Sequence, residues 1–392
     1  MTSNVLQRPT DAQRSTEQPL RVLTVNAGST GVRLRLLGVD DALLAEHHLD
    51  GVTANIDEPE LRAALADGLD QADAVGHLVA HGGSRFHEPT AIDAHVEAAL
   101  RELVDLAPLH QSKALAAVEA VERVLRRTPS VACFDTAFHA TLPAHATTYA
   151  LPASWIERWG VRRYGFQGCS HAWVARRVPE LLQRRAAGLR IVSCHLGACA
   201  SLCAIRDGCS VDTTMGFTPL DGLVMGTRSG SLDPGLLLWL MERVALTKRE
   251  LAQTLEQRSG LQGLSGSSDM RDVLARAENG EEPAVRARDV YVHHLRAGIA
   301  AMAASLEGVD VLVFTGGVGE HSPAIRTLAT AGLQFLGIEL NRELNETAET
   351  DVDVSTSGAP ARTFVIEARE DLEIARQVRE ALAKRHTGAG DR

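Results

Sequence analysis

Residues 21–37, RVLTVNAGSTGVRLRLL, form the segment from which the fold can be inferred. An apolar, β-branched run enters a small polar turn at 26–30, and a second strand follows in which apolar and basic residues alternate. Residues 189–205, LRIVSCHLGACASLCAI, repeat this order of strand, small turn and returning strand, with the turn at Gly197. The repetition predicts that the chain consists of two related halves.

Further strands and helices are expected outward from these two segments. Strands are predicted at 74–83, 130–135 and 309–315. Apolar residues recur with helical spacing at 59–72, 92–106, 232–257 and 287–306. Strands and helices mixed in one chain indicate an α/β architecture. The segment 150–154 is the expected boundary between two domains.

The composition is that of an ordinary folded protein, with 392 residues, 45% hydrophobic and 23% charged. The formal net charge of -10 argues against nucleic-acid binding through a basic surface, while a few local arginines could still hold a small anion. No apolar run is long enough for a transmembrane helix, and residues 1–20 are interpreted as a polar extension because they lack the apolar core of a secretory signal. The six cysteines contain no C-x-x-C pair, so free thiols and a cytoplasmic enzyme are expected.

Three strand-to-glycine turns are candidates for anion binding, because backbone N–H groups at such turns can point at a phosphate. They lie at 26–30, 195–201 and 316–319. The P-loop pattern and the Rossmann glycine fingerprint are both missing from the sequence. A glycine after a strand is usually only a turn, but three such turns in one chain favour the binding of nucleotide phosphates.

Several polar side chains near these turns have both a functional and a structural interpretation. Asp135 ends a predicted strand, where its carboxylate could serve a metal or cap a helix. His110 and His171 could contact a substrate or be satisfied within the core. Arg228 lies on a glycine-flanked loop, where its guanidinium could bind an anion or face the solvent.

The sequence resembles the acetate kinase family, the acetokinases that include propionate kinase, from Val22 to about Val378. The phrases FDTAFH at 134–139 and MGFTPLDGLVMGTRSG at 215–230 are long and nearly intact. Shorter matching segments are VNAGST, HGGSRF, LAPLH, GFQGCSH, HLGACAS, GLSGSSDMRDV, FTGGVGEHSP and EDLEIAR.

The resemblance implies two ribonuclease-H-like α/β domains of the sugar-kinase/Hsp70/actin type around a nucleotide cleft. The N-terminal domain would span 21–150 and be completed by a C-terminal helix at 371–385. The nucleotide-binding domain would span 151–370, and 386–392 would be a polar tail. The implied reaction is reversible in-line phosphoryl transfer from ATP to acetate, or to propionate or a larger acid, giving ADP and an acyl phosphate. Mg²⁺ is the implied cofactor and a homodimer the implied assembly.

The same resemblance implies roles for individual residues. The expected catalytic residues are Arg228, Asp135, His110 and Gln167. The metal would be placed by Asn26 and Glu370. The acyl pocket maps to Leu78, Ala80, Leu109, Phe166 and Pro219. Nucleotide and phosphate contacts are expected at Arg33, His195, Gly197, Ala198, Gly316, Gly317, Gly319, Asp269 and Arg271.

The chain departs from the family pattern at several of these positions. The family has histidine in place of Gln167, whose amide can donate a neutral hydrogen bond but cannot become cationic. The family's substrate arginine corresponds to Leu78, and its asparagine and glycine in the second turn correspond to Ala198 and Cys199. The terminal phrase also differs at 368–369.

These departures lead to three further expectations. Arg85, Arg162 and Arg163 are the candidate replacements for the missing arginine. Leu78 and Ala80 predict a roomier, more apolar pocket that accepts an acid of the size of propionate or larger. Two alternatives to an ordinary kinase stay open: a weakened or non-catalytic nucleotide-binding relative, and a kinase that uses a different phosphoryl donor.

Overall fold

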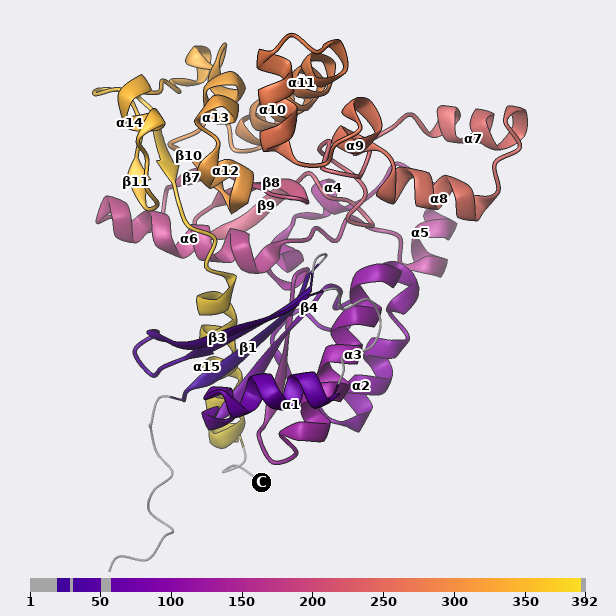
Figure 1. Ribbon diagram of the computed structural model, residues 1–392, viewed down its shortest axis with the longest axis vertical. Coiled ribbons are helices and arrows are strands. Elements are labelled where there is room, and N and C mark those ends of the chain that lie inside the picture. Colours follow the sequence, from indigo (N-terminus) through magenta and orange to yellow (C-terminus); the bar gives the residue numbers. More distant parts are fainter. Residues whose placement is uncertain (1–19, 29–30, 51–57, 389–392) are drawn as a thin grey trace, which may run out of the picture.

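The computed structural model of the chain describes residues 20–28, 31–50 and 58–388 (Figure 1), although not the side chains of 50, 108–109 and 386–388. The predicted extension at 1–20 therefore lies outside the described residues apart from Leu20, and the same holds for 389–392 of the predicted tail. Residues 386–388 belong to the last turn of the C-terminal helix. The chain forms two α/β units, which confirms the predicted fold class.

The N-terminal sheet has six strands in the order β3-β2-β1-β4-β6-β5. Its strands are β1 (Val22–Ala27), β2 (Gly31–Leu37), β3 (Leu43–Asp50), β4 (Ala74–Val79), β5 (Thr90–Ala91) and β6 (Ser130–Phe134). β1 pairs antiparallel with β2 and parallel with β4, which in turn pairs parallel with β6. All residues of β6 are buried, as expected for a strand whose sheet is covered on both faces.

The C-terminal sheet also has six strands, in the order β11-β12-β10-β7-β8-β9. They are β7 (Arg190–Leu196), β8 (Ala200–Arg206), β9 (Cys209–Thr213), β10 (Val311–Thr315), β11 (Val352–Asp353) and β12 (Arg362–Val365). β7, β8 and β9 form an antiparallel meander, β10 pairs parallel with β7 and β12, and β11 is an antiparallel edge. This is the arrangement of the N-terminal sheet repeated strand for strand, so the predicted pair of related halves is confirmed.

Helices cover both faces of the N-terminal sheet. Apolar residues of α1 (Glu58–Ala66) and α3 (Pro108–Val124) pack with β1 and β2 in one cluster. The opposite face is covered by α15 (Glu370–Gly388), whose Ile374 and Val378 pack against β1, β4 and β6 (Figure 1). The last helix of the chain therefore lies on the first sheet. Gly76 of β4 allows this close approach, because a Cβ there would lie 2.5 Å from Ile374.

The C-terminal sheet is covered in the same way. The long helix α11 (Glu282–Ser305) packs on one face, within the largest apolar cluster, and α6 (Gly168–Leu182) packs on the other. The remaining α-helices are α2 (Ala94–Arg101), α4 (Ala144–Thr147), α5 (Ala153–Trp159), α7 (Pro234–Arg243), α8 (Lys248–Gln257), α9 (Gly260–Ser265), α10 (Met270–Glu278), α12 (Gly316–His321), α13 (Pro323–Thr330) and α14 (Arg342–Glu346). In the described part of the chain, no helix combines the length and apolarity that crossing a membrane requires.

Candidate active site

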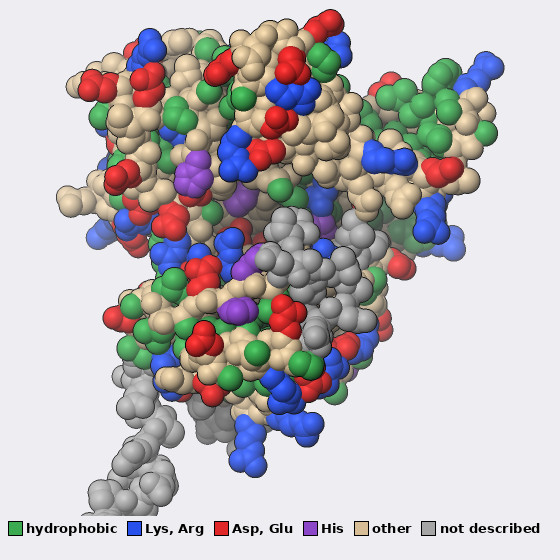
Figure 2. All heavy atoms as spheres, in the orientation of Figure 1, with side chains coloured by type: hydrophobic (Ala, Val, Ile, Leu, Met, Phe, Trp, Pro, Cys, Tyr) green, Lys and Arg blue, Asp and Glu red, His purple; other side chains and the backbone are tan. Residues whose placement is uncertain are grey.

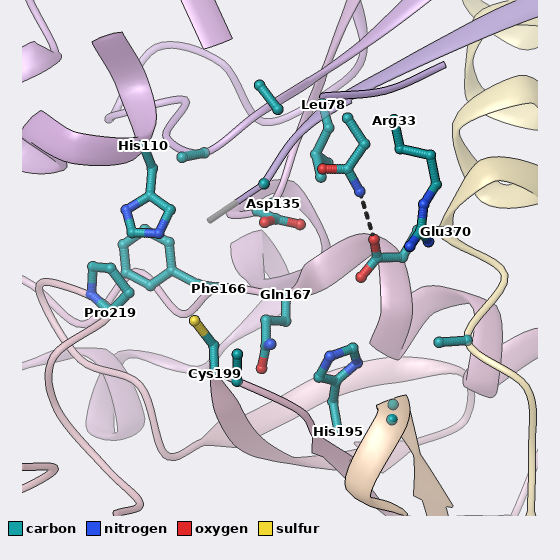
Figure 3. Close-up of a pocket in the computed structure, with 18 of the residues that line it drawn as sticks. Arg33, Leu78, His110, Asp135, Phe166, Gln167, His195, Cys199, Pro219 and Glu370 are labelled. Carbon is teal, nitrogen blue, oxygen red and sulfur yellow. Dashed lines mark hydrogen bonds between the residues drawn. The ribbon is translucent and has the colours of Figure 1, made fainter. Parts of the chain in front are cut away.

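A cavity of about 520 Å³ lies between the two units, where the turns of both sheets face each other; it is called the central cavity below. Figure 3 shows side chains from both units pointing into it. The structure brings most of the predicted site residues to this one cavity. Those that line it are Asn26, Arg33, Leu78, Ala80, His110, Asp135, Phe166, Gln167, His195, Ala198, Pro219, Arg228, Gly316, Gly317 and Glu370.

Five predicted residues are not seen in the lining of the central cavity. The side chain of Leu109 lies outside the described residues. Gly197 lies in the turn between β7 and β8. Gly319 lies within helix α12, because the segment predicted as a turn at 316–319 forms the start of a helix. Asp269 caps the N-terminus of α10 and pairs with the exposed guanidinium of Arg271, 2.6 Å away. Their predicted contacts with a nucleotide remain predictions.

Asn26 and Glu370 meet at one side of the cavity, although 344 positions separate them in the chain. The Asn26 amide donates a hydrogen bond to Glu370 Oε2 at 2.9 Å, which Figure 3 marks with a dashed line. Asn26 lies near the end of β1, and Glu370 is the first residue of α15. Loss of hydration raises the pKa of the Glu370 carboxyl, while Arg33 and Asn26 act in the opposite direction.

Asp135 directly follows β6 and faces the same part of the cavity (Figure 3). Its backbone N–H donates to the carbonyl of Val79, which fixes it beside the end of β4. Loss of hydration, followed by the nearby charge of Glu370, raises the pKa of Asp135 to about 8, although backbone N–H groups of Cys169 and Gln167 partly oppose the shift. Two neighbouring carboxyl groups of this kind favour a cation between or beside them.

Arg228 reaches the cavity from the loop before α7, and its side chain is buried. Its Nη2 lies 3.0 Å from His110 Nε2, and its Nη1 donates to Cys199 Sγ at 3.1 Å. Burial, with the charges of Arg228 and Lys113, lowers the pKa of His110 to about 4, so His110 is neutral and can accept this hydrogen bond. In the part of the chain that is described, Arg228 forms no ion pair with a carboxylate, which leaves its charge available for an anion.

The three glycine turns use some of their own amide groups internally. The N–H of Gly28 donates to the carbonyl of Gly31, and that of Gly197 to the carbonyl of Cys199. The N–H of Gly316 donates to the Glu320 carboxylate at 2.7 Å. These three N–H groups are therefore not free to bind phosphate. The turns offer fewer backbone donors to a phosphate than the sequence predicted. The turns instead place side chains and allow close backbone approach.

The absence of a side chain has a different physical consequence at Gly316 and at Gly317. Gly316 has a φ of +77°, and a Cβ there would lie 2.8 Å from the Leu196 carbonyl oxygen, so both conformation and space exclude a side chain. A Cβ on Gly317 would meet no atom within 4 Å, so this residue presents an open face to the cavity. A flat group such as a nucleobase could approach the backbone there.

Apolar side chains also line the cavity. They are Leu78 and Ala80, near and just after the end of β4, and Phe166, Met215 and Pro219 from the C-terminal unit. Leu78 packs with the apolar cluster around Ile374 of α15. The prediction that Arg85, Arg162 or Arg163 replaces the missing arginine is wrong, because none of the three lines the cavity. Arg85 pairs with Glu102, Arg163 donates to backbone carbonyls of 213–215, and Arg162 lies over the ring of Tyr164.

Sequence reasoning missed several lining residues. Arg35 lies two residues after Arg33 on β2, so the alternation of a strand would have placed both on one face. Arg35 pairs with Glu46 and Asp371, however, which compensates its charge. Met215, Glu320 and His321 lie within the matching segments but were given no role, whereas no local pattern pointed to His48, Ala114 or Glu367.

A family model, sequences and solved structures of known proteins resemble this chain. A model of the acetokinase family matches residues 38–376. The acetate kinase of Trichormus variabilis is 48% identical over 310 residues, which cover 79% of this chain and 76% of that protein. The crystal structure of Porphyromonas gingivalis acetate kinase matches with a TM-score of 0.84 and 34% identity, over 92% of this chain and 99% of that one. A propionate kinase structure from Francisella tularensis matches with a TM-score of 0.86 and 31% identity, over the same shares of the two chains.

Proposed function

Because the chain belongs to the acetokinase family, we propose that it transfers the γ-phosphoryl group of ATP to a short-chain carboxylate, giving ADP and an acyl phosphate. The observation that carries this proposal is the meeting of Arg228, His110, Asp135, Asn26 and Glu370 around one cavity. The reaction is reversible, because an acyl phosphate is itself a good phosphoryl donor.

The chemistry of this reaction suits the groups in the cavity. A carboxylate is already ionised at neutral pH, so the acceptor needs little help from a general base. The enzyme must bring two anions together and neutralise the charge on the transferred phosphoryl group, by positioning and fixed positive charge. Arg228 is the proposed source of that charge, and neutral His110 holds its guanidinium from one side.

The residues at the other side of the cavity fit a magnesium ion. Asn26 and Glu370 offer oxygen ligands, and Asp135, whose pKa is raised, faces the same space. Among the described residues, no cluster of three or more His, Cys, Asp or Glu could hold a metal alone, so nucleotide phosphates would complete the ligand set, as is usual for Mg²⁺. When bound, the ion would neutralise phosphate charge.

We assign nucleotide binding to the C-terminal unit and acceptor binding to residues of both units. Gly316 and Gly317 would border the adenosine, with His195 and Ala198 near the phosphates. Arg33 would contribute positive charge from β2. The apolar lining residues Leu78, Ala80, Phe166, Met215 and Pro219 would contact the alkyl group of the acid. An apolar lining favours propionate or a larger acid at least as much as acetate.

The deciding experiment is an acyl-phosphate assay with ATP and Mg²⁺, in which hydroxylamine traps the product as a hydroxamate. Acetate, propionate, butyrate and valerate are compared by kcat/KM. We expect product with all short acids and a maximum beyond acetate. Measurable ATP binding without product from any acid would favour the non-catalytic alternative, and a clear optimum at acetate would contradict the proposed pocket.

A homodimer is proposed from an exposed apolar helix. α7 has the sequence PGLLLWLMER, yet none of its residues is buried, and Leu238 and Trp239 are 64% and 53% exposed. Figure 2 shows hydrophobic side chains gathered on the arm that carries this helix. An exposed apolar surface of this kind is typical of a protein–protein contact. The acidic chain is expected to work as a cytoplasmic dimer.

The dimer proposal is tested by light scattering after size-exclusion chromatography. Leu238→Asp should shift the mass from dimer to monomer, because a charge would be buried in the interface. Leu344→Asp is the matched control, since Leu344 is exposed on α14, away from this helix. A wild-type protein that is monomeric at micromolar concentration would contradict the proposal.

A further inference from the structure

Gln167 is held by a buried chain of polar side chains that the proposed reaction does not yet explain. Gln167 is the capping residue immediately before α6. Its backbone has a left-handed conformation, with φ of 58°, and its side chain lines the central cavity. Figure 3 shows this side chain between Cys199 and His195. Its Oε1 accepts a hydrogen bond from the hydroxyl of Ser201 on β8.

The chain of hydrogen bonds continues into the core of the C-terminal unit. Ser201 Oγ lies 2.9 Å from His171 Nε2, and His171 Nδ1 lies 2.9 Å from Ser193 Oγ. Ser201, His171 and Ser193 are all 0% exposed, so water does not compete for these groups. These three residues are called the serine–histidine chain below. They come from β8, α6 and β7, three elements that pack rigidly together.

The direction of each hydrogen bond follows from the number of hydrogens available. Ser201 has one hydroxyl hydrogen and gives it to Gln167 Oε1. The contact with His171 therefore requires His171 to donate from Nε2. Burial, with the neighbouring His139 and His195, lowers the pKa of His171 well below its ordinary value, so the ring is neutral and carries only this one N–H. Nδ1 is then an acceptor for the Ser193 hydroxyl.

We propose that Ser201 and His171 are positioning residues, which fix the Gln167 amide with its oxygen toward β8 and its NH₂ group toward the phosphoryl group. The reverse arrangement would flip every hydrogen bond in the chain and present the amide oxygen to the cavity. An oxygen there would repel phosphate, whereas an NH₂ group donates to it. The tautomer of His171 thus orients the Gln167 amide so that its NH₂ group can donate a hydrogen bond to phosphate. A glutamine at this position cannot carry a positive charge.

The first test reads the tautomer directly and does not depend on the proposed activity. Long-range ¹H–¹⁵N spectra of protein labelled at histidine nitrogen distinguish the Nε2–H from the Nδ1–H form. The His171 signals are identified as those that Ser201→Ala and Ser193→Ala both alter. We expect neutral His171 with its hydrogen on Nε2. A hydrogen on Nδ1, or a charged ring at neutral pH, would overturn the proposal.

The second test is kinetic and rests on the proposed function. Ser201→Ala frees the amide to rotate, and kcat should fall about tenfold, the effect of one neutral hydrogen bond, with KM for ATP nearly unchanged. Gln167→Glu should cost more than Ser201→Ala, because it places a negative oxygen beside the phosphoryl group. An unchanged kcat in Ser201→Ala would contradict the positioning role.

Ser210 provides a matched control for the kinetic test. It is also a fully buried serine, and its hydroxyl lies 2.8 Å from the Nδ1 of another buried histidine, His139. The other ring nitrogen of His139, Nε2, is hydrogen-bonded to the backbone oxygen of Phe166 and not to Gln167. Ser210→Ala should therefore leave kcat close to the wild-type value. Equal losses in Ser210→Ala and Ser201→Ala would mean that both act only on folding.

Discussion

The two halves of the molecule share one sheet topology but give the central cavity very different chemistry. In each half, a three-stranded antiparallel meander continues into two parallel strands and ends in a short antiparallel edge. The N-terminal half places Asn26, Arg33 and Asp135 on the cavity, together with the carboxylate of Glu370 from the helix that covers it. The turn of the C-terminal half places His195, Ala198 and Cys199 there, none of which provides a fixed charge.

This difference shows that the repeated fold sets the positions of the side chains but does not set their chemical type. Among the described residues, Arg228 is the one lysine or arginine that the C-terminal half contributes to the lining. Leu78 leaves the end of β4 without a charge, while Arg35 of the N-terminal half is paired with carboxylates. The stabilisation of the transferred phosphoryl group is therefore concentrated in few residues.

The largest effect is expected when the positive charge of Arg228 is removed. Arg228→Ala should lower kcat by ~10²–10³-fold, because fixed positive charge at the developing phosphoryl anion is lost. Nucleotide affinity, measured by calorimetry, should change much less. Arg85→Ala is the control, since Arg85 pairs with exposed Glu102 outside the cavity. A kcat unaffected by Arg228→Ala would refute the assigned role.

A positive charge added to the N-terminal half should increase the activity with acetate. Leu78→Arg places a guanidinium beside the acceptor and near Asp135, and should raise kcat/KM for acetate by roughly ten- to a hundredfold through a charge-assisted hydrogen bond. Leu78→Met keeps the size without the charge and should give no gain. If Leu78→Arg and Leu78→Met behave alike with acetate, the apolar side chain is not what limits recognition of the carboxylate.

The smallest effect is expected in the pH dependence of stability. The pKa of Asp135 is raised to about 8 in the folded protein, so the unfolded chain releases this proton at lower pH than the folded one. Asp135 therefore favours the folded state at low pH, and this contribution is lost as pH rises toward 8. Without Mg²⁺, the unfolding free energy of the wild type should fall relative to Asp135→Asn between pH 6.5 and 8.5.

Other buried groups titrate below the range from pH 6.5 to 8.5. Burial lowers the pKa of His110 and of His195 to about 4, and such groups add stability as pH rises through the acidic range. Mg²⁺ with nucleotide should reduce the difference between wild type and Asp135→Asn, since a cation favours the ionised carboxylate. A constant difference across the window would mean that Asp135 ionises normally.

Local patterns located the central strands of both sheets and several helices, although they did not predict β3 or α3. The strand–turn–strand order around Asn26 and its repetition around Gly197 predicted two related halves, because alternation and turn chemistry depend on neighbouring residues. The resemblance to a known family, and not these local patterns, pointed to most of the predicted residues that line the cavity. The limits appear where an assignment depends on another part of the chain, as with Arg85, Arg162 and Arg163, whose partners lie elsewhere.

The α/β class, the repeated halves, the family and the identities of the chemical groups follow from the sequence. Which groups contact each other depends on the fold: Asn26 contacts Glu370, Arg228 contacts His110, and Gln167 contacts the serine–histidine chain. The fold also decided that Leu78 has no nearby arginine replacement among the three candidates. The physical reason is that hydrogen bonding, charge and loss of hydration depend on distance through space. The fold sets that distance for residues that are remote in the chain.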